Sequence, residues 1–124
     1  MQIIAGKYKG RKLLSPPTPG GTRPITSLAR KSLFDMLAGR FEDAVVADLY
    51  CGTGTLGLEA LSRGASTCLF ADADLAVIKR LRKNIQTFGA DQQCIIRKGE
   101  IFSRLKGWLS EVNLTLDVVF VDPP

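Results

Sequence analysis

The stretch DLYCGTGTLG, residues 48–57, decides the fold of this chain. It begins inside AVVADLY, residues 44–50, which is typical of a buried strand, and runs into GTLGLEALSRG, residues 54–64, which is typical of a helix. Glycines at 52, 54 and 57 allow a tight turn, a close approach of the backbone to a ligand, and close packing of the helix on the strand. This strand-turn-helix pattern predicts a site for a nucleoside-bearing cofactor at the free N–H groups of the helix start.

The rest of the chain continues the alternation of strands and helices. Strands are predicted at 66–72, 93–99 and 116–122, the last with a fully buried run at Val118–Val121, and helices at 73–89 and 101–112. Such alternation predicts an α/β fold with a parallel sheet. Upstream, a helix is predicted from Thr26 or Ser27 to about Ala38, preceded by a basic hairpin or arm and a Pro/Gly-rich loop. We therefore divide the chain into an arm and loop (1–25), a helix (26–40) and a cofactor-binding domain (41–124).

Composition and charge narrow the possible functions. The chain has 124 residues, 45% hydrophobic and 23% charged, which is ordinary for a globular domain, and no apolar run approaches the ~20 residues of a membrane span. We expect a cytoplasmic protein, because the N-terminal stretch lacks the features of a secretory signal. Histidine is absent, which excludes His-dependent nucleophilic catalysis and most zinc chemistry, and three widely spaced cysteines indicate neither disulfides nor a metal site.

The positive charge is concentrated at the front of the chain. Residues 1–40 hold eight Lys or Arg and one Asp, a net +7, whereas residues 41–124 hold nine bases and eleven acids, a net −2. A basic front on a nearly neutral body is typical of a protein that binds a polyanion, although many basic domains bind no nucleic acid.

Acidic residues at three strand ends indicate the kind of cofactor. Asp48 lies beside the loop where a pyrophosphate would sit, so it disfavours a dinucleotide and favours S-adenosylmethionine, which carries an ammonium and a sulfonium but no phosphate. Asp72, 20 residues beyond Gly52, is placed to accept hydrogen bonds from ribose hydroxyls. Glu100 ends the third strand, where it could accept from an adenine amine or favour the start of the next helix.

The motif Asp122-Pro123-Pro124 follows the fourth strand. The prolines stiffen the loop and remove backbone donors, so the Asp122 carboxylate and the Pro123 carbonyl form two acceptors on a rigid frame. Two acceptors suit a planar exocyclic amine whose lone pair must be freed for methylation, a task that needs positioning rather than a strong base. We predict these residues to be catalytic.

These motifs together resemble a known family. DLYCGTGTLGLEALSRGAS, FADAD, KGE and VFVDPP, with the front segments IIAGKYKGRKL and TRPITSLARKSLFDML, are similar to the bacterial small-subunit ribosomal-RNA guanine-N2 methyltransferases of the RsmD type. The resemblance implies a class I, Rossmann-like methyltransferase fold, here with strands in the order 3-2-1-4, and transfer from S-adenosylmethionine to a guanine N2. It implies the cofactor-binding residues Asp48, Tyr50, Cys51, Gly52, Gly54, Asp72, Ala73, Glu100 and Ile101, and the RNA-binding residues Lys7, Lys9, Arg11, Lys12, Arg23 and Arg30.

The implied partner is ribosomal RNA or an assembling small ribosomal subunit, without a membrane or a metal. Alternatives are methylation of an adenine amine or a protein glutamine, and a non-catalytic RNA-binding module; Asp48 and the Asp-Pro-Pro motif disfavour an NAD-linked oxidoreductase.

The chain departs from the family pattern at two acids. Family members usually have Glu at position 72 and Asp at 100, whereas this chain has the shorter acid at 72 and the longer acid at 100. The family continues past Asp-Pro-Pro with an aromatic residue and further strands, so we expect this chain to be part of a longer, monomeric protein. Alone, it should self-associate through residues 118–121.

Overall fold

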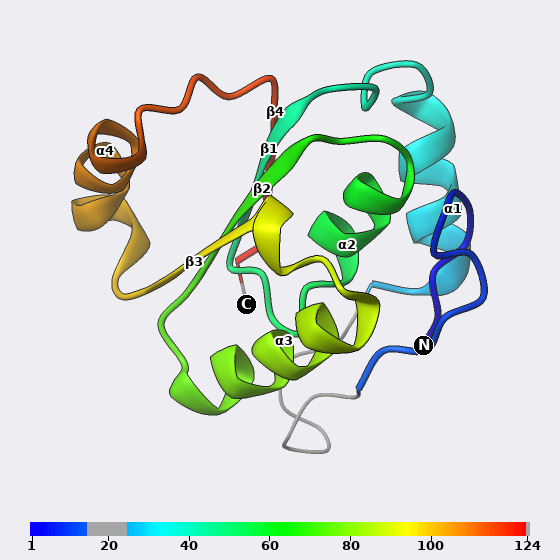
Figure 1. The fold of residues 1–124 in the computed structure, drawn as a ribbon, viewed down its shortest axis with the longest axis horizontal. Helices are drawn as coiled ribbons and strands as arrows, with labels where there is room; N and C mark the ends of the chain where they lie inside the picture. Colours follow the sequence, from blue (N-terminus) through cyan, green and yellow to red (C-terminus); the bar gives the residue numbers. More distant parts are fainter. Residues whose placement is uncertain (15–24, 124) are drawn as a thin grey trace.

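The computed structural model describes residues 1–14 and 25–123 and contains a parallel sheet flanked by helices on both faces (Figure 1). Its strands have the order β3-β2-β1-β4, as predicted. The elements along the chain are α1 (Ser27–Met36), β1 (Val45–Leu49), α2 (Thr55–Ser62), β2 (Thr67–Asp72), α3 (Leu75–Phe88), a 3-10 turn (Asp91–Gln93), β3 (Cys94–Lys98), α4 (Ile101–Val112) and β4 (Val118–Val121).

Alternation along the strands divides the core into two layers. Val46, Cys68 and Phe70 face the helices α1, α2 and α3, whereas Ala47 and Leu49 face α4. On the α4 side, Ile101 and Trp108 of α4 pack over the sheet, and Figure 1 shows this helix on the opposite side of the strands from α1–α3. Because strands with two covered faces are apolar on both, β1 and β2 carry the continuous apolar runs from which they were predicted.

The helix ends follow local capping chemistry. Thr26 caps α1 by accepting a hydrogen bond from the Ala29 N–H at 3.1 Å, as expected. Asp74 caps α3 in the same way, and Gly89 closes that helix in the left-handed conformation with φ 66°. The helix α1 ends at Met36, two residues before the predicted Ala38.

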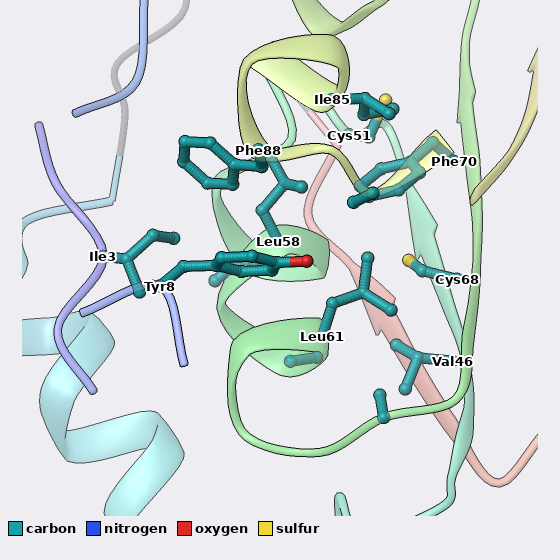
Figure 2. Packing of buried hydrophobic residues seen from close by; sticks show 14 of the residues in the cluster. Ile3, Tyr8, Val46, Cys51, Leu58, Leu61, Cys68, Phe70, Ile85 and Phe88 are labelled. Carbon is teal, nitrogen blue, oxygen red and sulfur yellow. The ribbon is translucent and has the colours of Figure 1, made fainter. Parts of the chain in front are cut away.

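The N-terminal segment 1–14 forms a hairpin-like arm that packs into the helical layer (Figure 2). An antiparallel bridge joins Gln2 to Lys12, and the Ile3 N–H donates to the Arg11 carbonyl at 2.9 Å. Tyr8 is buried, with its ring centroid 5.1 Å from that of Phe88 in α3. The arm therefore completes the core rather than extending from it, and every residue of α2, which lies beneath it, is buried.

The prediction of a fully buried strand at Val118–Val121 is wrong for this chain. Phe120 is 6% exposed and packs with Phe34 and Phe41, but Val119 and Val121 are 45% and 58% exposed. In the described residues β4 pairs with β1 alone, and α4 covers the far face over β1, β2 and β3 instead. Apolar side chains therefore remain exposed along an edge strand, and self-association through it stays a prediction.

No helix among residues 1–14 and 25–123 is long and apolar enough to span a membrane.

Candidate functional site

The predicted site residues meet at the carboxyl edge of the sheet. Leu49 of β1 is in register with Ala71 of β2 and Val121 of β4, and Asp72 is in register with Lys98 of β3. The segments that follow β1, β2, β3 and β4 therefore emerge side by side at one edge, which is where open α/β sheets bind ligands.

The loop after β1 is held in a strained, compact turn. Tyr50, Gly52 and Gly54 have φ angles of 59°, 57° and 89°, a region that glycine adopts freely and tyrosine rarely does. A Cβ on Gly57 would lie 2.3 Å from the Phe70 ring of β2, which confirms the expected close packing of helix on strand. The Gly52 N–H donates to the Asp72 carboxylate at 3.1 Å. Asp72 thus braces the glycine loop from the neighbouring strand.

Asp48 belongs to β1, and its carboxylate lies next to the first turn of α2. It is 2% exposed, and its Oδ2 accepts a hydrogen bond from the Gly57 N–H at 2.9 Å. Burial is the main cause that raises the pKa of Asp48 to about 8; the Gly57 hydrogen bond opposes this, and the nearby carboxylates of Asp122 and Asp72 add to it. Asp72 and Asp122 therefore lie close enough to Asp48 to favour its protonated form, and their two carboxylates favour a cationic ligand at this edge.

The free energy of unfolding should fall between about pH 4 and about pH 8 because of Asp48. The unfolded chain releases this proton near the ordinary pKa of 3.8, whereas the folded protein holds it until about pH 8. Between these values the folded state binds more protons, so stability decreases with rising pH, by up to about 1.4 kcal/mol per pH unit for a single group. Asp48→Asn removes this contribution.

Urea unfolding at pH 5 and pH 8 checks this prediction. The difference in stability between Asp48→Asn and the wild type should shift in favour of the variant at the higher pH. A constant difference at both pH values would show that Asp48 is ionised in the folded state at pH 5 and above.

Glu100 acts as the N-cap of α4. Its carboxylate accepts hydrogen bonds from the Phe102 and Ser103 N–H groups at 3.1 and 2.8 Å, and the hydrogen bonds from Ser103 are the main cause that lowers the pKa of Glu100. This confirms the local role considered for Glu100, namely that it favours the start of the next helix. A contact with adenine stays a prediction.

The other predicted cofactor residues differ in which atoms they could offer. Cys51 and Ile101 are buried with their side chains in the two core layers, so only their backbone atoms are candidates for a ligand contact. Burial raises the pKa of the Cys51 thiol well above its ordinary value, which argues against a nucleophilic role. Ala73 is exposed beside the brace residue Asp72.

Asp122 and Pro123 follow β4 and are both exposed. Pro124 lies outside the described residues. Within residues 1–14 and 25–123, no group of three or more His, Cys, Asp or Glu is placed to hold a metal ion, although Asp72 and Asp122 lie close enough to Asp48 to raise its pKa.

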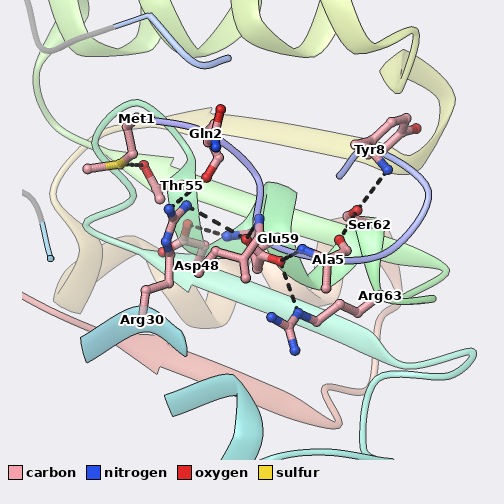
Figure 3. Close-up of polar contacts among 12 residues, drawn as sticks. Met1, Gln2, Ala5, Tyr8, Arg30, Asp48, Thr55, Glu59, Ser62 and Arg63 are labelled. Carbon is pink, nitrogen blue, oxygen red and sulfur yellow. Dashed lines mark hydrogen bonds and ion pairs between the residues drawn. The ribbon is translucent and has the colours of Figure 1, made fainter. Parts of the chain in front are cut away.

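The predicted RNA-binding residues of the arm are exposed, but Arg30 is not. Lys7, Lys9, Arg11 and Lys12 all lie at the surface. Arg30 has no exposed surface; its Nη2 donates to the Gln2 carbonyl at 2.7 Å, and its Nη1 lies 3.7 Å from Glu59 Oε1 (Figure 3). Direct contact of Arg30 with RNA is incompatible with this conformation, because α1 packs Arg30 under the arm. Arg23 lies outside the described residues.

The sequence interpretation did not predict the basic surface of α3 or the buried acid of α2. The sequence KRLRK, residues 79–83, places four bases on α3 without an acid, a signal that the net −2 of residues 41–124 concealed. Glu59 is completely buried in α2 and holds the arm through the Ile4 and Ala5 N–H groups at 2.9 and 3.1 Å. An isolated Glu in a predicted helix gives no sign of such a role.

The whole chain is similar to a described protein family and to a curated bacterial protein. The profile of the family described as Conserved hypothetical protein 95 matches residues 1–124. The ribosomal RNA small subunit methyltransferase D of Escherichia coli K12 is 39% identical over 124 residues, which are 100% of this chain and 60% of that protein. The chain thus spans about 60% of the length of this curated relative.

Solved structures agree with the fold. A hypothetical protein from Thermus thermophilus has a TM-score of 0.84 and 26% identity, covering 100% of this chain and 69% of that one. An RNA methyltransferase from Salinibacter ruber in complex with S-adenosyl-L-homocysteine has a TM-score of 0.57 and 20% identity, covering 64% of this chain and 52% of that one. The second likeness concerns the fold alone. A putative methyltransferase from Escherichia coli has a TM-score of 0.82 and 39% identity, covering 100% of this chain and 64% of that one. The class I methyltransferase sheet order predicted from the sequence is confirmed.

Proposed function

The chain belongs to the family described as Conserved hypothetical protein 95, and all 124 of its residues match 60% of the ribosomal RNA small subunit methyltransferase D of Escherichia coli. On this basis we propose that the protein methylates small-subunit ribosomal RNA. The donor is S-adenosylmethionine, and the acceptor is the exocyclic N2 amine of a guanine. The observation that carries this proposal is the placement of Asp122-Pro123 at the same sheet edge as the glycine loop braced by Asp72.

The residues at this sheet edge fit S-adenosylmethionine. Asp72 and Asp122 make the sheet edge acidic, which favours the ammonium and sulfonium of S-adenosylmethionine and disfavours a pyrophosphate. The Gly52 region is open, since a Cβ there would meet no atom within 4 Å, so backbone can approach a ligand. When bound, S-adenosylmethionine supplies an electrophilic methyl group. Asp72 then holds the ribose side of the site and Glu100 the adenine side.

The acceptor site requires two hydrogen-bond acceptors, which Asp122 and the Pro123 carbonyl provide. Together they accept hydrogen bonds from both N–H groups of an exocyclic amine, and this draws the nitrogen lone pair out of conjugation with the base. S-adenosylmethionine, when bound, would supply the methyl group that this freed lone pair takes up, and Asp122 or solvent would accept the proton that the amine loses. The base itself must leave its stack to reach this edge.

The RNA backbone is held by basic side chains of the arm and of α3. Lys9 and Lys12 are exposed on the arm, and Arg82 and Lys83 are exposed on α3. The arm docks against α3, where the Arg11 guanidinium donates to the Thr87 carbonyl at 2.8 Å, so the two basic segments are neighbours. Such clusters provide sequence-independent affinity for phosphates, which weakens with salt.

Methyl transfer with labelled S-adenosylmethionine tests the proposal. The protein is incubated with small-subunit ribosomal RNA, free or in assembled subunits, from cells that lack the modification. The RNA is then digested to nucleosides, and the label is expected in N2-methylguanosine.

Each other outcome of this assay identifies an alternative. Label in N6-methyladenosine, or in a protein glutamine of the assembled subunit, would change the acceptor but keep the amino-group chemistry that Asp122-Pro123 supports. RNA binding without transfer of label would identify a non-catalytic RNA-binding module and contradict the proposal.

A further inference from the structure

The side chain of Asn84 connects two segments that the proposed function uses separately. Asn84 lies within α3 and is 2% exposed. Its Oδ1 accepts a hydrogen bond from the Leu14 N–H at 2.9 Å, and its Nδ2 donates to the Thr53 carbonyl at 3.0 Å. Leu14 is at the end of the described arm, and Thr53 belongs to the glycine loop. One buried amide therefore bridges the RNA-binding arm and the cofactor loop.

The glycine loop is held from two sides by polar side chains. Asp72 accepts from the Gly52 N–H on the side of the sheet edge, whereas Asn84 donates to the next residue, Thr53, from the side of α3. Thr53 is itself buried, at 8% exposure, so its carbonyl depends on a protein donor. The position of this part of the loop consequently depends on the orientation of the Asn84 amide.

A second contact ties the arm to the same region. The Thr55 hydroxyl, in the first residue of α2 after the loop, lies 3.3 Å from the Met1 sulfur (Figure 3). The arm thus contacts the cofactor loop region at both of its ends, through Met1 and through Leu14. The middle of the arm is fixed to α2 by Glu59, which accepts from the Ile4 and Ala5 N–H groups.

We propose that Asn84 is a positioning residue that couples occupancy of the arm by RNA to the cofactor affinity of the glycine loop. The carbonyl and NH₂ groups of an amide are fixed in one plane, so a shift of Leu14 relative to α3 turns the amide and disturbs its bond to Thr53. RNA that holds the arm in its docked position therefore favours the loop conformation that binds cofactor. Reciprocity requires the cofactor to favour RNA binding by the same factor. This inference rests on the proposed function.

A merely structural role for Asn84 makes a different prediction. A buried amide that only satisfies two backbone groups would, when removed, lower stability and weaken both ligands without changing their mutual effect. The informative quantity is therefore the coupling factor, which is the Kd for cofactor without RNA divided by the Kd with saturating RNA.

Calorimetric titration of the full chain with S-adenosylhomocysteine, with and without small-subunit ribosomal RNA, measures this factor. S-adenosylhomocysteine lacks the methyl group, so no turnover disturbs the equilibrium. In the wild type the factor is expected to be about fivefold or more, the lower end of typical allosteric coupling. Asn84→Ala should reduce it to about one.

Leu14→Pro tests the same bridge from the other side. Proline removes the N–H that Asn84 accepts and leaves Asn84, α3 and the Thr53 bond in place. This variant should also bring the coupling factor to about one while S-adenosylhomocysteine still binds, and it keeps the test valid if Asn84→Ala does not fold.

Gln93→Ala is the matched control, because Gln93 accepts a hydrogen bond from Lys7 of the arm at 3.2 Å, while its own amide donates to the Ala65 and Ser66 carbonyls rather than to the loop. It should keep the wild-type factor. A factor of one in the wild type, or an unchanged factor in both Asn84→Ala and Leu14→Pro, would overturn the inference. Failure of the wild type to bind either ligand would refute the proposed function and the coupling with it.

Discussion

Asp122→Ala is expected to lower kcat for methyl transfer by about a hundredfold or more, while the Kd for S-adenosylmethionine changes by less than about threefold. Asp122 follows Val121, the last residue of β4, which is in register with Leu49 just ahead of the glycine loop. In our proposal Asp122 holds the acceptor amine rather than the cofactor. Removing it leaves the amine with a single acceptor, so the lone pair stays conjugated with the base. Single-turnover rates and equilibrium titration of the same preparation separate the two effects.

Two further variants sharpen the interpretation of Asp122. Asp122→Asn keeps an acceptor oxygen without the charge and should give an intermediate rate. Asp117→Ala is the control, because Asp117 lies at the opposite end of β4, where it accepts from the Val45 N–H at 2.8 Å, and should leave kcat within about twofold of the wild type. If Asp122→Ala retained more than a third of the wild-type rate, Asp122 would have no catalytic role.

The sheet and its ligand edge could be predicted because local chemistry determines them. The strand ahead of Asp48, the glycine turn and the helix after it are adjacent in sequence, and parallel topology then places Asp72 and Asp122 at the same edge. Likewise, the helical pattern predicted over 73–89 locates α3, which the structure bounds with the caps Asp74 and Gly89. Each of these inferences requires only neighbouring residues and a general rule of sheet geometry.

The roles of Arg30, Glu59 and Asn84 could not be predicted, because each depends on a partner far away in sequence. Arg30 and Glu59 are 29 positions apart, and a buried arginine has the same sequence signature as an RNA-binding one. Asn84 looks like one more polar residue on an amphipathic helix, although its bonds reach Leu14 and Thr53, 70 and 31 positions away. Tertiary packing of the arm decides all three.

Glu59→Ala should lower the free energy of unfolding by about 3–5 kcal/mol, a large part of the ~5–15 kcal/mol that stabilises a typical domain. The Glu59 carboxylate, with no exposed surface, accepts from the Ile4 and Ala5 N–H groups and from Arg63 Nε at 2.9 Å. Its loss leaves two amides of the arm without acceptors and Arg30 without its buried counter-charge. Urea unfolding gives the global effect, and amide exchange at Ile4 and Ala5 reports release of the arm.

Replacing Arg30 should cost much less than replacing Glu59, although the two form one ion pair. Arg30 Nε and Nη1 have no hydrogen-bond partner, its distance to Glu59 is 3.7 Å, and burial lowers the pKa of Arg30. Arg30→Met therefore removes a poorly compensated charge, while Glu59 keeps Arg63 and both arm amides. Glu59→Gln, which keeps an acceptor but no charge, should fall between Arg30→Met and Glu59→Ala.

The exposed pair Lys31–Asp35 provides the matched control for Glu59. Like Glu59 and Arg63, these residues are four positions apart in sequence, but their side chains are 59% and 58% exposed. Asp35→Ala should change stability by less than about 0.5 kcal/mol, because water replaces the lost partner. If Glu59→Ala were as mild as Asp35→Ala, or if Arg30→Met were the more damaging of the buried pair, Glu59 would not be the residue that fixes the arm. The order Asp35→Ala, Arg30→Met, Glu59→Gln, Glu59→Ala, from least to most destabilising, follows from burial and from the number of hydrogen bonds that each change leaves unsatisfied.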